Sequence, residues 1–216
     1  KRIGVEKILS ISAVGSLKEE HQPGKVIVVD QYIDRTFKRI NTFFQDGCVA
    51  HTPLGDPICR GLSNSIITIL KKNNIEHSKK GTYICIEGPQ FSTRAESNLY
   101  RSWGCDVIGM TNMPEAKLAR EAGICYVSLA MVTDYDCWHP DHEDVSIDAI
   151  QKVMSSNILK AHSVIRYLSE SETIHEKACN DCTSNMSDIV ITDSADKEQT
   201  FLDLIKTTKI KDESKR

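Results

Sequence analysis

The stretch Ala130-Met131-Val132-Thr133-Asp134-Tyr135-Asp136-Cys137-Trp138-His139 joins an apolar strand to two carboxylates that flank an aromatic residue. Polar side chains at the carboxyl end of a buried strand are where open α/β sheets bind their ligands. Two earlier segments share this design, in which small, hydroxyl-bearing or Gly/Pro residues follow a strand: Ile8–Leu17 and Glu87–Ser97. The sequence therefore predicts an α/β fold with a ligand site at its strand ends.

Alternating strand and helix patterns extend this prediction along the chain. Near-continuous apolar runs, typical of a sheet buried on both faces, predict strands at Lys7–Ser12, Lys25–Gln31, Thr82–Ile86, Val107–Met110 and Tyr126–Val132. Amphipathic patterns predict helices at Leu62–Lys72, Thr93–Trp103, Glu115–Ala122 and Ile147–Leu168. A Thr93-x-x-Glu96 capping box begins the second helix, and Gly104 and Gly123 end the second and third.

Length and composition favour a single domain. With 216 residues and 40% hydrophobic composition, the chain can bury one substantial core. We expect the core in residues 1–168, a polar link in 169–195, and a last helix near Lys197–Lys206 within a tail of residues 196–216.

Charge and hydropathy exclude some classes of partner. The formal net charge is −3 with acidic and basic residues interspersed, so no basic stripe indicates nucleic-acid binding. No long apolar run indicates a membrane segment, and the chain starts without a signal-peptide pattern or an initiator Met. We therefore expect a cytoplasmic, processed or cut chain that acts on small molecules.

Taken together, the three opening segments resemble the methylthioadenosine phosphorylases of the trimeric purine nucleoside phosphorylase family, from Gly4 to about Leu168. The resemblance implies a mixed central sheet flanked by helices on both faces. It also implies phosphorolysis of 5′-methylthioadenosine to adenine and 5-methylthioribose 1-phosphate, with inorganic phosphate as co-substrate and without a metal or organic cofactor.

The phosphate site follows from strand ends and from the resemblance. Small residues after the first strand would let backbone N–H groups approach an anion closely. The resemblance assigns phosphate contacts to Ser12, Ala13 and Thr111. A helix-capping hydroxyl before Pro114 is the alternative role for Thr111.

The resemblance also assigns the nucleoside contacts. Met110 lies against the ribose, Phe91 stacks on the purine, and Ser92 stands where the hypoxanthine-directed branch carries Glu. Asp134 donates a proton to purine N7, Asp136 accepts from the 6-amino group, and Tyr135 between them joins the substrate site. The alternative for the two carboxylates is a solvated acidic turn.

Two further positions concern specificity and assembly. Ile147 matches a position that favours an alkylthio group, and His51 matches a residue that an adjoining subunit contributes. A homotrimer with a shared site is therefore expected, with a surface histidine as the alternative for His51.

The resemblance fails at the start of the chain. A Gly-rich phosphate loop and an Arg-His-Gly segment have no counterpart here, so we expect an N-terminally incomplete fold that lacks two strands. Gln90 also stands where close relatives carry Arg. An adenosine or methylthioinosine phosphorylase, or a catalytically silent nucleoside-binding remnant, remains an alternative.

The eight cysteines point to no metal site in the sequence alone. Six are scattered without metal-ligand spacing and are expected to be buried small hydrophobes: Cys48, Cys59, Cys85, Cys105, Cys125 and Cys137. The Cys179-x-x-Cys182 pair matches zinc half-sites, but His175 is the sole further ligand nearby. Two inert thiols, or a local disulfide resembling those in the tails of some archaeal relatives, are expected instead.

Overall fold

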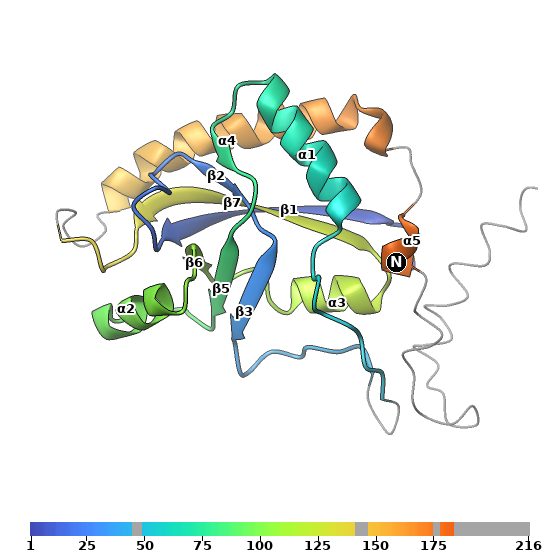
Figure 1. Cartoon of the computed structure of the whole chain (residues 1–216), viewed down its shortest axis with the longest axis horizontal. Helices are drawn as coiled ribbons and strands as arrows, with labels where there is room; N and C mark the ends of the chain where they lie inside the picture. Colours follow the sequence, from blue (N-terminus) through green and yellow to red (C-terminus); the bar gives the residue numbers. More distant parts are fainter. Residues whose placement is uncertain (45–48, 141–146, 175–177, 184–216) are drawn as a thin grey trace, which may run out of the picture.

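The computed structural model describes residues 1–44, 49–140, 147–174 and 178–183, which form a seven-stranded mixed sheet with helices packed around it (Figure 1). The strands are β1 (Lys7–Ser16), β2 (Val26–Val28), β3 (Gln31–Arg35), β4 (His77–Ser78), β5 (Thr82–Ile86), β6 (Val107–Gly109) and β7 (Cys125–Tyr135). The helices are α1 (Arg60–Lys72), α2 (Arg94–Ser102), α3 (Glu115–Glu121), α4 (Ile147–Ser169) and α5 (Asn180–Thr183), with a 3₁₀ turn at Glu172–Ile174.

The sheet is built around β1 and β7, which run parallel over almost their whole length. The strand order is β3-β5-β6-β1-β7-β2-β4. Two of the pairings, β1 with β6 and β7 with β2, are antiparallel, so the sheet is mixed as expected. Every residue of β7 from Cys125 to Thr133 is buried, which explains its continuous apolar sequence.

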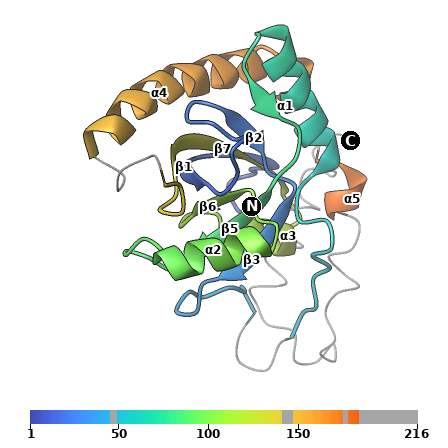
Figure 2. The ribbon, with the colours of Figure 1, turned by 60° about the vertical axis from the view of Figure 1, so that its left-hand side comes forward.

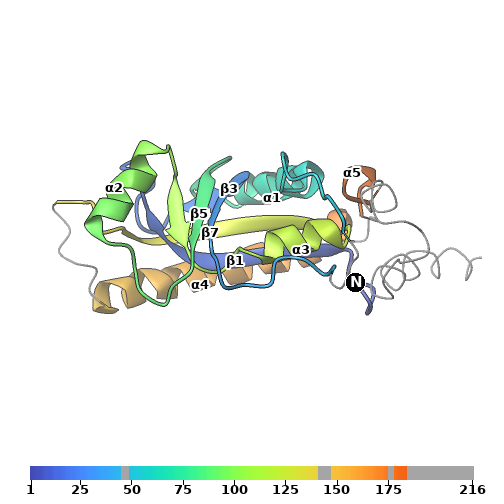
Figure 3. The same ribbon diagram turned by 90° about the horizontal axis from the view of Figure 1, so that it is seen from below.

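Helices cover both faces of the sheet, as the resemblance implied. Figure 2 shows α1 and α4 on one side of the strands and α2 and α3 on the other. Figure 3 shows α4 running along the length of β1 and β7. The Asn157 amide of α4 donates to the Val132 carbonyl at 2.9 Å, which fixes this helix on β7.

The local signals for helix ends are confirmed. Thr93 caps α2 with both hydrogen bonds of the capping box to Glu96. Gly104 and Gly123 follow α2 and α3 with φ values of 83° and 59°, a left-handed conformation that glycine adopts without strain.

The predicted strand Lys25–Gln31 was wrong as a single element. The chain changes partners at Asp30: β2 pairs with β7, whereas β3 pairs with β5. Asp30 Oδ1 accepts from the Gly81 N–H at 2.9 Å, and the Asp30 N–H donates to the Gly81 carbonyl at 3.1 Å. This reciprocal contact holds the crossing point. The short β4 escaped prediction because two polar residues give no apolar pattern.

The segment after α4 returns to the core. Cys182 in α5 is 7% exposed and joins the main apolar cluster, together with Ala178 and Cys179. The predicted helix near Lys197–Lys206 lies outside the described residues, as does Cys48.

In the described part of the chain, no helix combines the length and apolar character needed to cross a membrane.

Candidate active site

A cavity of about 310 Å³ lies at the carboxyl ends of the central strands. Seven of the predicted site residues line it: Ala13, Phe91, Ser92, Met110, Thr111, Asp134 and Asp136. They come from β1, the segment after β5, the end of β6 and the end of β7. The strand ends therefore bring together residues that are more than a hundred positions apart in the sequence.

A β-bulge in β7 sets the position of the first carboxylate. Val14 pairs with Val132 and Gly15 pairs with Asp134, so Thr133 is the extra residue of the bulge. The Thr133 hydroxyl lies 3.2 Å from the Val14 carbonyl oxygen and 2.5 Å from Asp134 Oδ1. A Cβ on Gly15 would lie 3.4 Å from Asp134 Oδ2 and 3.1 Å from Ile108 Cγ2. A side chain at position 15 would therefore crowd Ile108, whereas its contact with the carboxylate would be an ordinary one.

Burial favours the acid form of Asp134. Removal from water raises its pKa to about 6, the negative charge of Asp136 acts in the same direction, and the Thr133 hydroxyl opposes both. A carboxyl group with a pKa near neutrality is suited to general acid catalysis. Asp134 therefore has the electrostatics that its predicted role requires.

The second carboxylate offers an unused acceptor. Asp136 is 7% exposed, burial raises its pKa, and the solvated acidic turn is excluded for it. Asp136 Oδ2 and Ser92 Oγ are buried atoms without a hydrogen-bond partner among the described residues. An unpaired buried polar atom costs about 1–3 kcal/mol, so both atoms are suited to a ligand that carries hydrogen-bonding groups.

Asn112 connects the two predicted phosphate hydroxyls. Ser12 Oγ donates to Asn112 Oδ1 at 3.5 Å, and Thr111 Oγ1 lies 3.3 Å from the same oxygen. The Asn112 amide donates to the Tyr32 hydroxyl at 2.9 Å and to Ser128 Oγ. Ser12 itself does not line the cavity, but this fully buried amide places it beside Thr111.

The alternative role of Thr111 as a helix cap is not seen. Pro114 is the N-cap residue of α3, and no side chain forms a capping hydrogen bond there. The Thr111 hydroxyl instead lies 3.4 Å from the Tyr83 hydroxyl. A Cβ on Gly109 would stand 2.0 Å from Tyr83 Oη, so this approach requires glycine.

Arg39 joins the two loops that carry the predicted nucleoside contacts. Its guanidinium donates to the Met110 carbonyl at 2.7 Å and to the Glu87 carbonyl at 2.8 Å, and Nε lies 3.3 Å from Glu87 Oε1. Gly88 follows with a φ of 68°, and a Cβ there would lie 2.6 Å from Met110 Sδ. The thioether is therefore fixed against the loop that carries Phe91 and Ser92.

The outer rim is less enclosed than the floor. Phe91 is 78% exposed, so its ring lies at the mouth of the cavity. The Cys137 thiol donates to the Ser92 carbonyl at 3.4 Å, which joins the rim to the loop after β7. Stacking of Phe91 on a purine remains a prediction.

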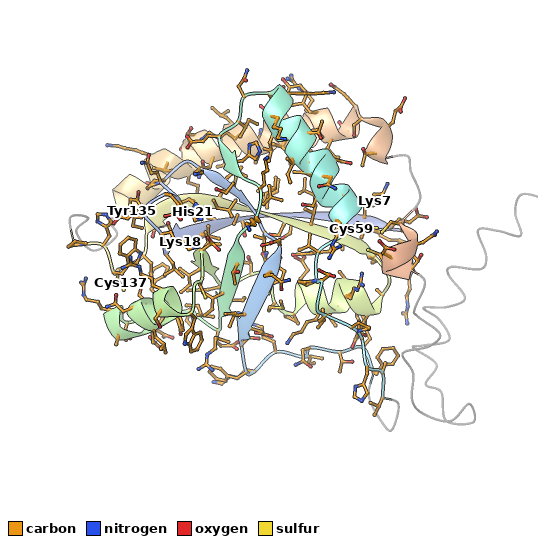
Figure 4. The ribbon with its side chains drawn as sticks, in the orientation of Figure 1. Lys7, Lys18, His21, Cys59, Tyr135 and Cys137 are labelled. Carbon is orange, nitrogen blue, oxygen red and sulfur yellow. The ribbon has the colours of Figure 1, made fainter. Side chains whose placement is uncertain are left out.

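Tyr135 and His51 do not line this cavity. Tyr135 points to the opposite face of β7 from its two neighbours, where it packs on Trp138 and His139 and its hydroxyl donates to the Glu19 carbonyl at 3.0 Å. Figure 4 labels it at the same end of the sheet as Cys137. His51 lines a separate cavity with Lys117 and Glu121. Ile147 is the first residue of α4, and its side chain lies outside the described part.

Sequence reasoning missed Asn112, Arg39 and Met154. Asn112 directly follows the predicted Thr111, and this adjacency was the available signal. Met154 appeared as one position of an apolar helix face, yet it lines the cavity. No local pattern marks Arg39, whose four backbone and two side-chain acceptors come from distant segments.

A strand-end cavity with paired carboxylates in a mixed sheet is the arrangement that the resemblance to the phosphorylases implied. Residues 1–170 match the model of the Phosphorylase superfamily, so the chain belongs to this family.

Matches to individual proteins are more specific than the match to the family. The chain is 58% identical over 166 residues to an S-methyl-5'-thioadenosine phosphorylase of Koribacter versatilis, covering 77% of this chain and 57% of that protein. It is 52% identical over 196 residues to one of Geobacter sulfurreducens, covering 90% and 68%. The chain thus spans between about half and two thirds of these relatives.

Solved structures agree with the fold. A methylthioadenosine phosphorylase from an antarctic soil metagenomic library superposes with a TM-score of 0.83 at 42% identity, covering 94% of this chain and 72% of that one. A methylthioadenosine phosphorylase from Schistosoma mansoni in complex with adenine gives 0.74 at 30% identity, covering 80% and 70%.

Proposed function

We propose that this chain provides the nucleoside-binding and proton-donating part of a 5′-methylthioadenosine phosphorylase. The reaction cleaves the N-glycosidic bond with phosphate and yields adenine and 5-methylthioribose 1-phosphate. The observation that carries the proposal is the pair of buried carboxylates: Asp134, with a pKa raised to about 6, and Asp136, with an unpartnered oxygen.

The proton of Asp134 goes to the departing base. As the bond from C1′ to N9 breaks, its electrons move onto the purine, and Asp134 protonates N7 so that adenine leaves as a neutral molecule. A phosphate oxygen forms the new bond to C1′. Asp134 ends as a carboxylate and regains its proton from solvent in the next turnover.

Asp136 selects the base in this scheme. Its buried Oδ2 accepts a hydrogen bond from the 6-amino group of adenine, which fills the acceptor position left open in the cavity. A 6-oxo purine presents an acceptor at that position instead. Two carboxylates therefore favour adenine nucleosides over methylthioinosine.

The wall of the cavity supports the alkylthio preference. Ile86, Ile108, Met110 and Met154 make much of this wall apolar. An apolar wall gives a 5′-hydroxyl no partner, whereas it can pack against a methylthio group. This distinguishes methylthioadenosine from adenosine.

Phosphate is proposed to lie near Ala13 and Thr111, with Ser12 held in place by Asn112. The resemblance supplies the remaining parts of the proposal: a cytoplasmic homotrimer, His51 reaching an adjoining site, and no organic cofactor.

Adenine release from methylthioadenosine, adenosine and methylthioinosine, measured at saturating phosphate, tests the function. We expect the order of kcat/KM to place methylthioadenosine first. Calorimetry with a methylthioadenosine analogue separates an enzyme from a silent remnant, because phosphate should tighten binding to an enzyme and leave binding to a remnant unchanged. Equal affinity with and without phosphate, together with no adenine release, would refute the proposal.

A further inference from the structure

Four cysteines from distant parts of the sequence meet at the other end of the sheet. Cys59 is the N-cap residue of α1, and Cys125 is the first residue of β7. Cys179 and Cys182 belong to the segment around α5. Their four Sγ atoms all lie within 4.8 Å of one another. Figure 4 labels Cys59 at the end of the molecule opposite Tyr135 and Cys137, so this cluster is distinct from the active-site cavity.

The spacing of the sulfurs fits a metal ion better than a disulfide. Cys179 Sγ lies 3.6 Å from Cys59 Sγ and 3.7 Å from Cys125 Sγ. Four sulfurs placed about 2.3 Å from a tetrahedral zinc ion are about 3.8 Å apart. A disulfide needs about 2.05 Å. All four thiols are free in the structure.

The surroundings stabilise sulfur ligands. The Cys179 backbone N–H donates to Cys125 Sγ at 3.3 Å, and Arg120 Nη1 donates to Cys182 Sγ at 3.5 Å. Cys59 lies at the N-terminus of a 13-residue helix, where the partial positive charge favours a thiolate. Three of the four residues are buried and the fourth is partly buried, so little water reaches the centre of the cluster.

We propose that Cys59, Cys125, Cys179 and Cys182 bind one Zn²⁺ in a closed tetrahedral site. Four thiolates leave no open position, so the ion is structural and takes no part in phosphorolysis. Thiolate ligands select zinc over magnesium and calcium, which prefer oxygen. On binding, each thiol loses its proton to solvent as its sulfur bonds the metal.

The site would fasten the segment after α4 onto the core. Residues 178–183 carry two of the ligands, while the other two lie on the first residue of β7 and at the start of α1. Other contacts of this short segment include the Ala178 N–H to Glu6 Oε2 at 3.2 Å and the packing of Ala178 against the main apolar cluster. The sequence pattern predicted no metal site here. It could not reveal the other two ligands, because Cys59 and Cys125 precede Cys179 by 120 and 54 positions.

Metal content is the direct test. The protein is expressed with zinc in the medium, purified under reducing conditions without chelator, and analysed by elemental mass spectrometry. We expect one zinc per chain, and near zero after Cys182→Ser or Cys59→Ser. The matched control is Cys105→Ala, a buried cysteine outside the cluster, which should keep its zinc.

A spectroscopic measurement on the unsubstituted protein covers the case in which a variant fails to fold. Cobalt replaces zinc in the metal-free protein, and we expect thiolate-to-cobalt charge-transfer bands with the intense visible bands of a tetrahedral site. A folded, reduced protein that binds well under one zinc per chain and gives no such bands would overturn the proposal. So would two disulfides joining these four cysteines in the freshly purified protein.

Discussion

Asp134→Asn should separate catalysis from stability. The pKa of Asp134 is about 6 against an ordinary value of 3.8, so at pH 7 about a tenth of the molecules carry the acid form, roughly a hundredfold more than for an unperturbed carboxyl. Asparagine cannot transfer a proton. Loss of a general acid costs about 10²–10⁴-fold, and we expect kcat/KM for adenine release to fall by at least two orders of magnitude.

The same substitution should not weaken the fold. The folded-state pKa is raised, so the acid form stabilises the fold below pH 4, and this contribution is lost as the pH rises through about 6. At pH 7 the ionised carboxylate therefore destabilises the protein, by up to about 3 kcal/mol for a shift of this size. Asparagine removes that cost, and Tm should stay the same or rise.

Paired measurements check both expectations. Initial rates of adenine release are taken from pH 5 to 9, and Tm is measured at pH 7 on the same samples. The unsubstituted protein should lose kcat/KM as the pH rises through about 6, and the variant should lack this limb. Asp56→Asn is the control, since that carboxylate pairs with Arg60 on the surface. A parallel loss of activity and Tm in Asp134→Asn would refute the assignment of Asp134 as a proton donor.

Three further substitutions test the support of the site. Asn112→Ala should raise KM for phosphate about tenfold, because a lost hydrogen bond of this kind is worth about 1–1.5 kcal/mol, and an unchanged phosphate KM would contradict the role of its Oδ1. Gly109→Ala should lower Tm and kcat together, because its Cβ would overlap Tyr83 Oη, and thermal melts with rates decide this. Burial raises the pKa of Asp106, but hydrogen bonds from His21 and other donors outweigh it and lower this pKa to about 2. The ionised Asp106 carboxylate therefore stabilises the fold above pH 4, and this stabilisation is lost as the pH falls toward 2. Asp106→Asn should therefore flatten the acid limb of urea-unfolding stability, and an unaltered limb would count against this linkage.

The sequence predicted most of the fold because its signals were local. The apolar run Thr82–Ile86 coincides with β5, and the Thr93 capping box begins α2 where expected. The switch of partners at Asp30 could not be predicted in this way. It depends on a reciprocal contact with Gly81, fifty-one residues further along the chain.

The site was predictable to the same extent and for the same reason. Strand ends and the resemblance identified Asp134, Asp136 and Ser92, which the fold brings to one cavity. Arg39 joins two loops through their backbone carbonyls, and no residue type or spacing in the sequence predicts such contacts. Tyr135 is the opposite case, since it was predicted to join the substrate site and does not. Strand alternation alone places its side chain on the face away from its two neighbours.

The properties of β7 explain how the protein tolerates two carboxylates in a dry cavity. Each buried carboxylate with a raised pKa opposes folding at neutral pH, and for Asp134, whose pKa is about 6, this cost reaches about 3 kcal/mol at pH 7. The preceding residues of the strand are buried and paired with β1 on one side and β2 on the other. Burial of a single Val or Leu side chain contributes about 1.5–3 kcal/mol, so Val127, Leu129 and Val132 together exceed that cost. The strand can therefore hold its two carboxylates in an unfavourable environment because its apolar middle is strongly held in place.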